Sequence, residues 1–298
     1  MRALVTGGAG FLGSHLVDRL VGAGHDITIL DNFRRGRHAF LPAQGVRVSE
    51  GDIRDYDAVA AVCAGVDMVF HLAAQSNVLG AMQDIDYSFT TNVVGTFNVL
   101  KAATRADCAK VIFSSSREVY GEQSVLPVPE SASLTAKNPY GASKLAGEAY
   151  CRAWASFGSL ECAVLRFGNL YGPRDTGRVI PLWIERALRG DPLQVFGGDQ
   201  VLDFVPVSMA VDALLAAATR PLDGPVNVGT GLATPILALA ERIRELTSRR
   251  SEIQLLPARG AEVVRFVADT RRMRELLGTV PPADPLEALP QLCAAFAA

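Results

Sequence analysis

The stretch TGGAGFLG, residues 6–13, decides the fold class of this chain. It follows the apolar run ALV at residues 3–5, which we expect to form a strand. It leads into an amphipathic segment over residues 12–23 that we expect to form a helix. Glycines at such a junction allow a tight turn and a close approach of the backbone to a pyrophosphate, and a helix N-terminus favours an anion. The order of strand, glycine loop and helix predicts a dinucleotide-binding loop rather than a glycine-rich turn without a ligand.

Strand and helix patterns alternate through the first two thirds of the chain. Short β-branched runs, which we expect to form strands, occur at residues 3–7, 27–31, 46–52, 68–74, 110–116 and 162–169. Helical patterns lie between them, for example over residues 92–105. This alternation predicts an α/β fold, a Rossmann-type doubly wound parallel sheet with helices on both faces. Ligands of such sheets bind beyond the carboxyl ends of the strands.

The pattern changes after about residue 170. The segments that follow are a Gly/Pro/Arg loop at 172–177, a helix at about 181–189, a strand near 203–207, a helix at 209–218, strands at 226–228 and 253–256, and flanking helices. Residues 125–139 hold three prolines and little periodicity, so we expect a loop there. We predict a dinucleotide-binding Rossmann domain of residues 1–169 plus 204–231, and a smaller C-terminal α/β lobe of residues 170–203 plus 232–298 that binds the substrate.

Composition excludes several classes of protein. The 298 residues are 49% hydrophobic and carry a net charge of −2, with no basic block of the kind that nucleic acid requires. Apolar stretches are short and interrupted, and no basic-apolar-small segment precedes the first expected strand, so we expect neither a membrane span nor a signal peptide. The five cysteines show no metal-ligand spacing. We therefore expect a cytoplasmic protein with reduced cysteines and no metal, nucleic-acid or membrane partner, and composition by itself names no function.

Asp31 ends the second expected strand, 18 residues after Gly13. A carboxylate in this place can accept both ribose hydroxyls of an adenosine and would repel a 2′-phosphate, which favours NAD over NADP. Three arginines at positions 34, 35 and 37 could receive such a phosphate, although we favour a solvated loop. Asp52, at the end of the third expected strand, is either a contact to the adenine edge or a turn former.

Tyr140 and Lys144 lie four residues apart in NPYGASK, residues 138–144, and Pro139 suits a helix start. A phenol titrates near pH 10, about three units above neutrality, but a lysine ammonium one turn away and a cationic nicotinamide favour the phenolate. Such a group can take the proton of an alcohol while a hydride leaves the same carbon. In the serine run at 114–116, a hydroxyl could donate to the reacting oxygen, or the run could simply cap a turn.

These motifs, with others over nearly the full length, resemble those of the extended short-chain dehydrogenase/reductases, the NAD-dependent epimerase/dehydratase family of nucleotide sugars. The shared stretches are TGGAGFLG (6–13), LDNFRRGR (30–37), GDIRD (51–55), HLAA (71–74), TNVVGTFNVL (91–100), FSSSREVYGE (113–122), NPYGASK (138–144), LRFGNLYGPR (165–174), NVGTG (227–231) and ARGAEVVRFVAD (258–269). The resemblance implies NAD as cofactor and a nucleotide sugar as substrate, for which we expect UDP.

The resemblance also implies roles for individual residues. Tyr140 becomes the catalytic base and acid, Lys144 its partner, and Ser116 the hydroxyl on the reacting oxygen. The implied cofactor contacts are Gly7, Gly10, Phe11, Leu12, Gly13, Asp31, Asn32, Asp52, Ile53, Leu72, Ala73, Ala74, Asn92, Ser114, Tyr140, Lys144 and Phe167, with Asn92 also supporting the site structurally. The implied substrate contacts are Ser116, Asn169, Arg178, Val195 and Arg259, the last on the diphosphate.

The chain departs from the family pattern in two places. Leu202 stands where relatives often carry a phosphate-binding arginine, and Arg174 or Arg178 could supply that contact instead. Arg117 and Glu118 stand where the family's 4,6-dehydratases carry an acidic pair, while decarboxylases that make UDP-xylose also have glutamate at the second position. Glu118 is therefore a further candidate catalytic residue.

Three functions are compatible with these residues. We predict an NAD-dependent nucleotide-sugar 4-epimerase that acts through a transient 4-keto sugar, because Ser116, Tyr140 and Lys144 suffice for it. A 4,6-dehydratase or UDP-glucuronate decarboxylase is the alternative that Glu118 keeps open. A non-catalytic NAD-binding scaffold is a remote alternative, because such proteins usually lack the Tyr/Lys pair.

We also predict a homodimer. In relatives, the helices corresponding to residues 92–105 and 140–157 pair into a four-helix bundle. Here they carry apolar side chains that we expect the sheet of one chain to cover only in part, namely Val94, Phe97, Leu145 and Trp154. Some of these could equally be core residues.

Overall fold

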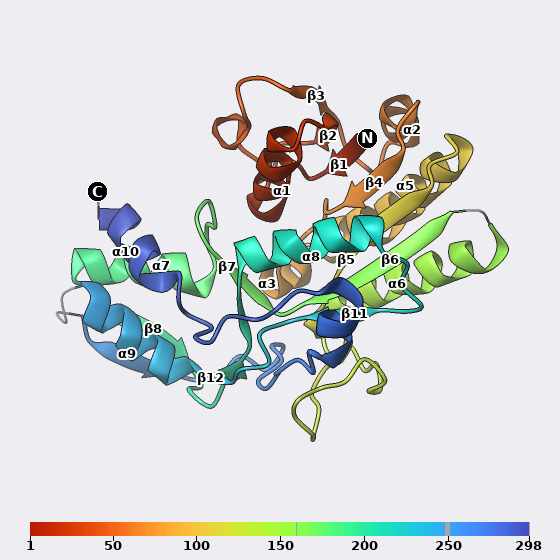
Figure 1. The fold of residues 1–298 in the computed structure, drawn as a ribbon. Helices are drawn as coiled ribbons and strands as arrows, with labels where there is room; N and C mark the ends of the chain where they lie inside the picture. Colours follow the sequence, from red (N-terminus) through yellow and green to blue (C-terminus); the bar gives the residue numbers. More distant parts are fainter. Residues whose placement is uncertain (159, 248–250, 298) are drawn as a thin grey trace.

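The computed structural model describes residues 1–158, 160–247 and 251–297. Its centre is a seven-stranded sheet in the order β11-β6-β5-β4-β1-β2-β3 (Figure 1). The strands are β1 Arg2–Thr6, β2 Asp26–Asp31, β3 Val46–Glu50, β4 Met68–His71, β5 Lys110–Ser116, β6 Glu161–Phe167 and β11 Val226–Val228. All neighbouring strands run parallel. The Rossmann-type α/β fold predicted from the strand–helix alternation is confirmed.

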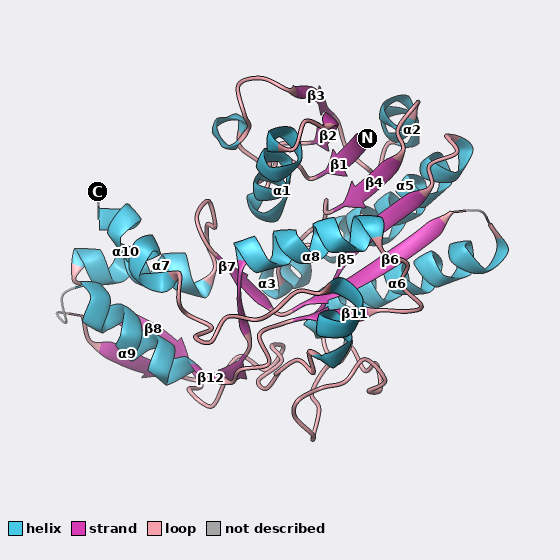
Figure 2. Ribbon diagram, viewed as in Figure 1, coloured by secondary structure: helices cyan, strands magenta, loops and turns pink. Residues whose placement is uncertain are grey.

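Helices cover both faces of this sheet (Figure 2). On one face lie α1 Phe11–Gly22 and α8 Val207–Thr219, and on the other lie α2 Tyr56–Cys63, α5 Gly95–Arg105 and α6 Pro139–Phe157. Between β4 and α5 the chain forms α3 Val78–Gln83, α4 Ile85–Phe89 and the π-helix η2 Thr90–Val94, and short 3-10 turns lie at η1 His38–Phe40 and η3 Arg117–Val119. The helix expected over residues 92–105 therefore begins as a π-helix and continues as α5.

A separate apolar core forms on each face of the sheet. Leu16 of α1 and Leu214 of α8 are fully buried in the first core, and Val99 of α5 and Phe113 of β5 are buried in the second. Burial of each such side chain contributes roughly 1.5–3 kcal/mol. Because the inner strands β1, β4, β5 and β6 are buried on both faces, they consist largely of hydrophobic residues, and their carboxyl ends lie at one edge of the sheet.

The C-terminal elements form a smaller layer beside the sheet (Figure 1). Three two-stranded sheets occur here: β7 Asn169–Tyr171 with β10 Phe204–Pro206, β8 Leu193–Phe196 with β13 Ile253–Leu256, and β9 Val201–Leu202 with β12 Thr234–Pro235. The helical elements of this layer are α7 Val179–Arg189, α9 Ile236–Thr247 and α10 Leu289–Ala297, whereas η4 Met273–Leu277 packs on the large sheet against α8 and β11. The core of this layer contains Trp183, Leu202 and Leu239. The strand expected near residues 203–207 is β10, which pairs with β7 and not with the large sheet. The proposed division of the chain into two domains stays a prediction.

None of the helices in the described part of the chain is both long and apolar enough to cross a membrane. The five cysteines are free thiols.

Candidate active site

The predicted glycine loop joins β1 to α1 and has a shape that only glycine allows. Gly7 has a φ of +72°, and a Cβ at this position would lie 2.8 Å from the backbone nitrogen of Ala73. A Cβ at Gly13 would collide with the carbonyl oxygen of Gly7. The N-cap residue Gly10 has no side chain to bond the first N–H groups of α1, so these groups can bind an anion. The cradle therefore fits a pyrophosphate.

Asp31 lies beside this loop at the end of β2. Its two carboxylate oxygens accept hydrogen bonds from the backbone N–H groups of Ala9 and Phe33, both at 2.9 Å. Burial raises the pKa of Asp31, and the two hydrogen bonds oppose that rise. Each oxygen keeps a further lone pair for a ribose hydroxyl. The site thus fits the adenosine half of NAD.

Two of the three neighbouring arginines are engaged with other groups. The Arg34 guanidinium stacks 3.8 Å from the centroid of the Tyr87 ring. Arg35 donates to Ser76 Oγ at 3.2 Å and to the carbonyl oxygen of Thr176 at 3.1 Å. Because both terminal nitrogens of Arg35 are bonded and Arg34 is held against an aromatic ring, these two side chains are directed at protein groups, which agrees with the preference for NAD argued from Asp31.

Asp52 follows β3 and organises its own turn. Burial alone would raise the pKa of its carboxyl, but hydrogen bonds from Arg54 and Asn32 lower it to about 2. Arg54 donates to both carboxylate oxygens at 2.9 Å, and Asn32 donates to one of them at 2.9 Å. The neighbouring Ile53 is buried beneath Gly95 of α5. A contact between Asp52 and an adenine edge stays a prediction.

Asn92 connects the loop after β4 to α6. Its amide oxygen accepts from Gln75 N at 2.8 Å, and its amide nitrogen donates to Gln75 O at 3.1 Å and to Ser143 Oγ at 2.8 Å. These bonds hold the segment Leu72–Ala74 next to the glycine loop, where Ala73 N also donates to Thr6 Oγ1. The Asn92 amide is thus already engaged with the protein, and its predicted cofactor contact stays untested.

Helix α6 presents the predicted reactive pair. Asn138 caps the helix, its Oδ1 accepting from Gly141 N at 2.9 Å, and Pro139 occupies the first turn. Tyr140, in this first turn, hydrogen-bonds to Ser116 at the end of β5. Lys144 lies one turn further, donates to the carbonyl oxygen of Ser114 at 2.7 Å, and places its Nζ 6.0 Å from the centroid of the Tyr140 ring. The structure therefore brings these predicted residues together.

Burial shifts the two reactive groups in opposite directions. It raises the pKa of Tyr140, while the hydrogen bond from Ser116 lowers it. Burial also lowers the pKa of Lys144 to about 8. Lys144 is therefore still largely protonated at neutral pH, as stabilisation of a Tyr140 phenolate requires.

Glu118 has both carboxylate oxygens occupied. Arg117 Nη2 pairs with Oε1 at 3.0 Å, and Asn138 Nδ2 donates to Oε2 at 2.7 Å. Arg117 and Glu118 are both buried. Glu118 is near enough to raise the pKa of Tyr140, so it belongs to the site, but it is held as an ion-pair partner.

A buried network behind the reactive residues was missed by sequence reasoning. Arg166 of β6 donates to Glu148 of α6 through Nε at 2.9 Å and Nη2 at 2.6 Å. Ser115 Oγ donates to the same carboxylate at 2.5 Å. Glu148 lies one turn after Lys144, so this network fixes α6 against β5 and β6. The spacing of Glu148 four residues after Lys144 could have indicated this network. Its partner Arg166 could not be found from the spacing, because it lies 18 residues further along the chain.

His71 was also missed. It ends β4 and lies fully enclosed between the hydroxyls of Thr6 and Thr96, at 2.8 and 2.9 Å. Burial lowers the pKa of His71 to about 3, and the charge of Lys144 adds to this. A neutral imidazole therefore connects β1, β4 and α5 directly beneath the glycine loop.

The predicted substrate residues lie on the C-terminal side of the site. Phe167 ends β6, and Asn169 begins β7 with its Oδ1 buried and unpaired among the described residues. The Arg178 guanidinium carbon lies 5.2 Å from the Phe11 ring centroid, next to the glycine loop. The Val195 side chain is fully buried in the core of the lobe, and its backbone lies in the ladder between β8 and β13, so its predicted substrate contact stays a prediction.

The phosphate contact missing at Leu202 has two candidate replacements. Leu202 packs into the core of the lobe and cannot bind an anion. Arg174 forms an ion pair with Asp18 of α1 at 2.7 Å. Arg259 instead stacks 3.6 Å over the Phe196 ring, beside Glu262 at 3.6 Å. Arg178 also pairs with an acid, Asp175, at 2.9 Å, so each of these three arginines has an acidic neighbour and the diphosphate contact stays a prediction.

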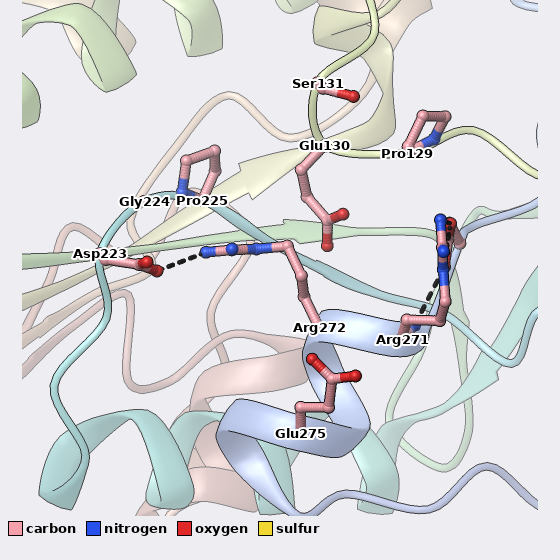
Figure 3. A pocket seen from close by; sticks show the side chains of 10 residues that line it. Pro129, Glu130, Ser131, Asp223, Gly224, Pro225, Arg271, Arg272 and Glu275 are labelled. Carbon is pink, nitrogen blue, oxygen red and sulfur yellow. Dashed lines mark hydrogen bonds and ion pairs between the residues drawn. The ribbon is translucent and has the colours of Figure 1, made fainter.

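A cavity of about 460 Å³ lies elsewhere, between the loop after Pro129 and η4 (Figure 3). Glu130 and Glu275 point into it, and Arg272 pairs with Asp223 at 2.7 Å. Its lining includes none of the predicted site residues. It is therefore separate from the candidate active site.

Comparisons with known proteins identify the family of this chain. Residues 3–229 match the model of the NAD dependent epimerase/dehydratase family. A putative UDP-glucose 4-epimerase from Methanocaldococcus jannaschii is 36% identical over 94% of this chain and 93% of that protein. The UDP-glucuronic acid decarboxylase 1 of Danio rerio is 34% identical over 94% of this chain and 69% of that protein.

Solved structures give the same result. UDP-glucose 4-epimerase from Thermotoga maritima with UDP-glucose has a TM-score of 0.95 and 33% identity, covering 99% of this chain and 98% of that one. MoeE5 in complex with UDP-glucuronic acid and NAD has a TM-score of 0.89 and 32% identity, covering 97% and 96%. The cofactor is NAD, which the glycine cradle and Asp31 fit. The chain belongs to the NAD-dependent epimerase/dehydratase family.

Proposed function

We propose that this chain is a nucleotide-sugar 4-epimerase. The observation that carries the proposal is the contrast between two groups at the site. Tyr140 is bonded to Ser116 with Lys144 one turn away, whereas both oxygens of Glu118 are already bonded. Tyr140 is therefore suited to exchange a proton with a sugar hydroxyl, whereas Glu118 is suited to hold its neighbours in place.

Each residue of the site has a separate role in the proposed reaction. When bound over the glycine loop beside Asp31, NAD would supply a reversible hydride acceptor for the sugar C4. Tyr140 accepts the proton of the 4-hydroxyl and gives it back, and Lys144 stabilises its phenolate. Ser116 donates a hydrogen bond to the oxygen as it becomes a carbonyl. Epimerisation then requires only that the keto sugar turn over before hydrogen returns to its other face.

The nucleotide in this proposal is UDP, since the relatives and complexes reported above carry UDP sugars in their names. Arg178 and Arg259 are the proposed diphosphate ligands. Residues 1–169 plus 204–231 form the proposed cofactor domain, and residues 170–203 plus 232–298 the proposed substrate lobe.

A dehydratase or decarboxylase remains the second candidate, because Glu118 lies close to Tyr140 and a decarboxylase is among the relatives. The test is the variant Glu118→Gln, with products of a UDP-sugar panel identified by NMR. An epimerase should keep its activity within about tenfold, because no proton passes through Glu118. A 4-keto product that accumulates in the variant would favour the second candidate. Ser116→Ala is the matched variant that should slow either reaction by about a hundredfold.

The enzyme is a homodimer in this proposal. Apolar side chains on α4, η2 and α6 are exposed on one chain, including Ile85, Phe89, Val94 and Phe157, the last at 73%. Of the side chains expected at such an interface, Phe97 and Trp154 contact one another at 5.4 Å between ring centroids and are half-buried. Light scattering at micromolar concentration should give twice the mass of one chain, and a monomer would refute the assembly.

A further inference from the structure

Arg117 follows Ser116 directly, and one terminal nitrogen of its guanidinium forms no hydrogen bond with the described residues. The residue is only 9% exposed. Its Nη2 pairs with Glu118 at 3.0 Å, but its Nη1 is buried and has no hydrogen-bond partner among the residues that the structure describes. Buried guanidinium nitrogens are nearly always bonded to an acceptor, so this one calls for an acceptor that the chain does not supply.

The surroundings of Arg117 identify what kind of acceptor fits. Its guanidinium lies 5.9 Å from the Phe266 ring centroid, which gives it an apolar wall on one side. Its charge reaches the reactive phenol, because Arg117 and Arg178 both lower the pKa of Tyr140 against the rise that burial causes. Because Arg117 also follows Ser116 directly in the chain, its guanidinium lies near the residues that react with the sugar in the proposed function.

Three cations lie around Tyr140 among the described residues, and one of them, the Lys144 ammonium, has no carboxylate partner. Glu118 is shared by Arg117 and Asn138, and Arg178 pairs with Asp175 at 2.9 Å. The ammonium of Lys144 bonds to a neutral carbonyl oxygen, that of Ser114. A buried site with an excess of positive charge favours a ligand that brings a negative one.

We propose that Arg117 binds a carboxylate at C6 of the sugar, and that the substrate is a nucleotide-linked hexuronic acid. This inference rests on the proposed function, since it takes Ser116 and Tyr140 to hold the C4 oxygen. C5, the carbon next to C4, carries C6, so an acid at C6 is the charged group nearest to the reacting carbon. A guanidinium recognises a carboxylate through short, charge-assisted hydrogen bonds.

The same contact protects the intermediate of the reaction. Loss of hydride from C4 and of the hydroxyl proton to Tyr140 leaves a ketone at C4 of a β-keto acid. Such an acid loses carbon dioxide when the electron pair of the C5–C6 bond moves toward the C4 oxygen. A guanidinium that binds the carboxylate stabilises the negative charge where it already is, and therefore opposes this movement. Arg117 thus favours epimerisation over decarboxylation.

The first test compares substrates on the unmodified enzyme. UDP-glucuronic acid, UDP-glucose and UDP-N-acetylglucosamine are supplied separately, and products are identified by NMR. We expect the 4-epimer of the acid, with kcat/KM at least about tenfold above that of either neutral sugar. Equal or faster epimerisation of a neutral sugar would overturn the inference and leave the proposed function intact.

The second test changes the guanidinium. Arg117→Gln should lower the ratio of kcat/KM for the acid to kcat/KM for UDP-glucose by about 10- to 100-fold, because loss of the charge near Tyr140 affects both substrates whereas loss of the carboxylate contact affects only the acid. Arg117→Lys should restore part of the loss. Because Arg117→Gln leaves Glu118 unpaired, the double variant with Glu118→Gln keeps the pair neutral, and Arg47→Gln on exposed β3 controls for net charge.

Two further outcomes separate the inference from the proposed function. If the acid is consumed with release of carbon dioxide and Arg117→Gln reduces that consumption, the proposed function fails while the carboxylate assignment stands. If Arg117→Gln lowers turnover of acid and neutral sugars equally, the assignment fails. Binding to Tyr140→Phe enzyme gives an independent readout: UDP-glucuronic acid should bind more tightly than UDP-glucose, and Arg117→Gln should remove that difference.

Discussion

The carboxyl edge of the large sheet and the C-terminal lobe hold their polar side chains in different ways. At the sheet edge, Lys144 and Glu148 are buried and bonded to Ser114 and Arg166. In the lobe, Arg259 stacks on an aromatic ring and its side chain is 37% exposed. In the proposed function, the reaction therefore takes place among buried, hydrogen-bonded side chains, whereas the proposed nucleotide ligand is a partly exposed side chain. One scaffold can therefore keep its oxidation step while its substrate changes.

The largest effect is expected at the sheet edge, from Tyr140→Phe. The variant removes the only group proposed to exchange the hydroxyl proton, so turnover should fall by roughly 10³-fold or more. Its ring still packs as before, so NAD should remain bound. Activity is measured by product NMR, and retained NAD by mass spectrometry of the purified protein. More than a tenth of wild-type activity would show that another group moves the proton.

Breaking the network behind Tyr140 should cost stability next. Glu148→Gln leaves the buried Arg166 charge without its anion, so the free energy of unfolding should fall by about 3–5 kcal/mol in urea titrations. The exposed pair of Arg19 and Asp212 is the matched control, with side chains 54% and 51% exposed. Asp212→Asn should change stability by less than about 1 kcal/mol. Equal losses in the two variants would contradict the contrast between buried and exposed pairs.

Sequence patterns predict the parts of this site that depend on neighbours along the chain. The glycine loop, Asp31, and the pair of Tyr140 and Lys144 are recognisable because their chemistry needs particular residues within one turn or at one strand end. The partners of Glu148 and His71 could not be predicted in this way. They lie 18 and 65 residues away in the sequence, and only the strand order brings them together.

The lobe was predicted less well for a related reason. Strands of two or three residues, such as β9, β10 and β12, are too short to show a period. The sheet in which β10 pairs is decided by packing, not by its own residues. Similarly, Leu202 is conspicuous in the sequence only as a departure from a pattern, and its place in the apolar core explains why it is not an arginine.

The buried imidazole at the sheet edge predicts a pH effect on stability. Burial holds the pKa of His71 at about 3, below its ordinary value. Between pH 6.5 and 3 the unfolded chain therefore binds a proton that the folded chain does not, and the free energy of unfolding falls as pH falls, by about 1.4 kcal/mol per unit from this group. His71→Gln should flatten that slope in urea titrations between pH 6.5 and 4.5. His25→Gln serves as the control at a less buried position, and an unchanged slope in the His71 variant would contradict the assignment.

The smallest effect is expected in the lobe. Arg259→Ala should raise KM for the nucleotide sugar by about tenfold, because one charge-assisted contact to the diphosphate is lost. Its kcat should change by less than about twofold, because the residue does not touch the reacting atoms. Arg189→Ala, at an exposed position of α7, is the control in steady-state assays. A fall in kcat with unchanged KM would show that Arg259 acts in the reaction, and it would contradict the proposal that this residue only binds the nucleotide.

The fate of carbon-bound hydrogen in heavy water tests the central claim most directly. In the proposed 4-epimerase, the hydrogen removed from C4 returns to C4, Tyr140 exchanges only the hydroxyl proton, and the C5–H bond is never broken. The product formed in D₂O, analysed by mass spectrometry and NMR, should therefore contain no deuterium bound to carbon. A dehydratase or decarboxylase must deliver a solvent proton to carbon, so one deuterium per product molecule, at C5 or at a carbon next to it, would contradict the account.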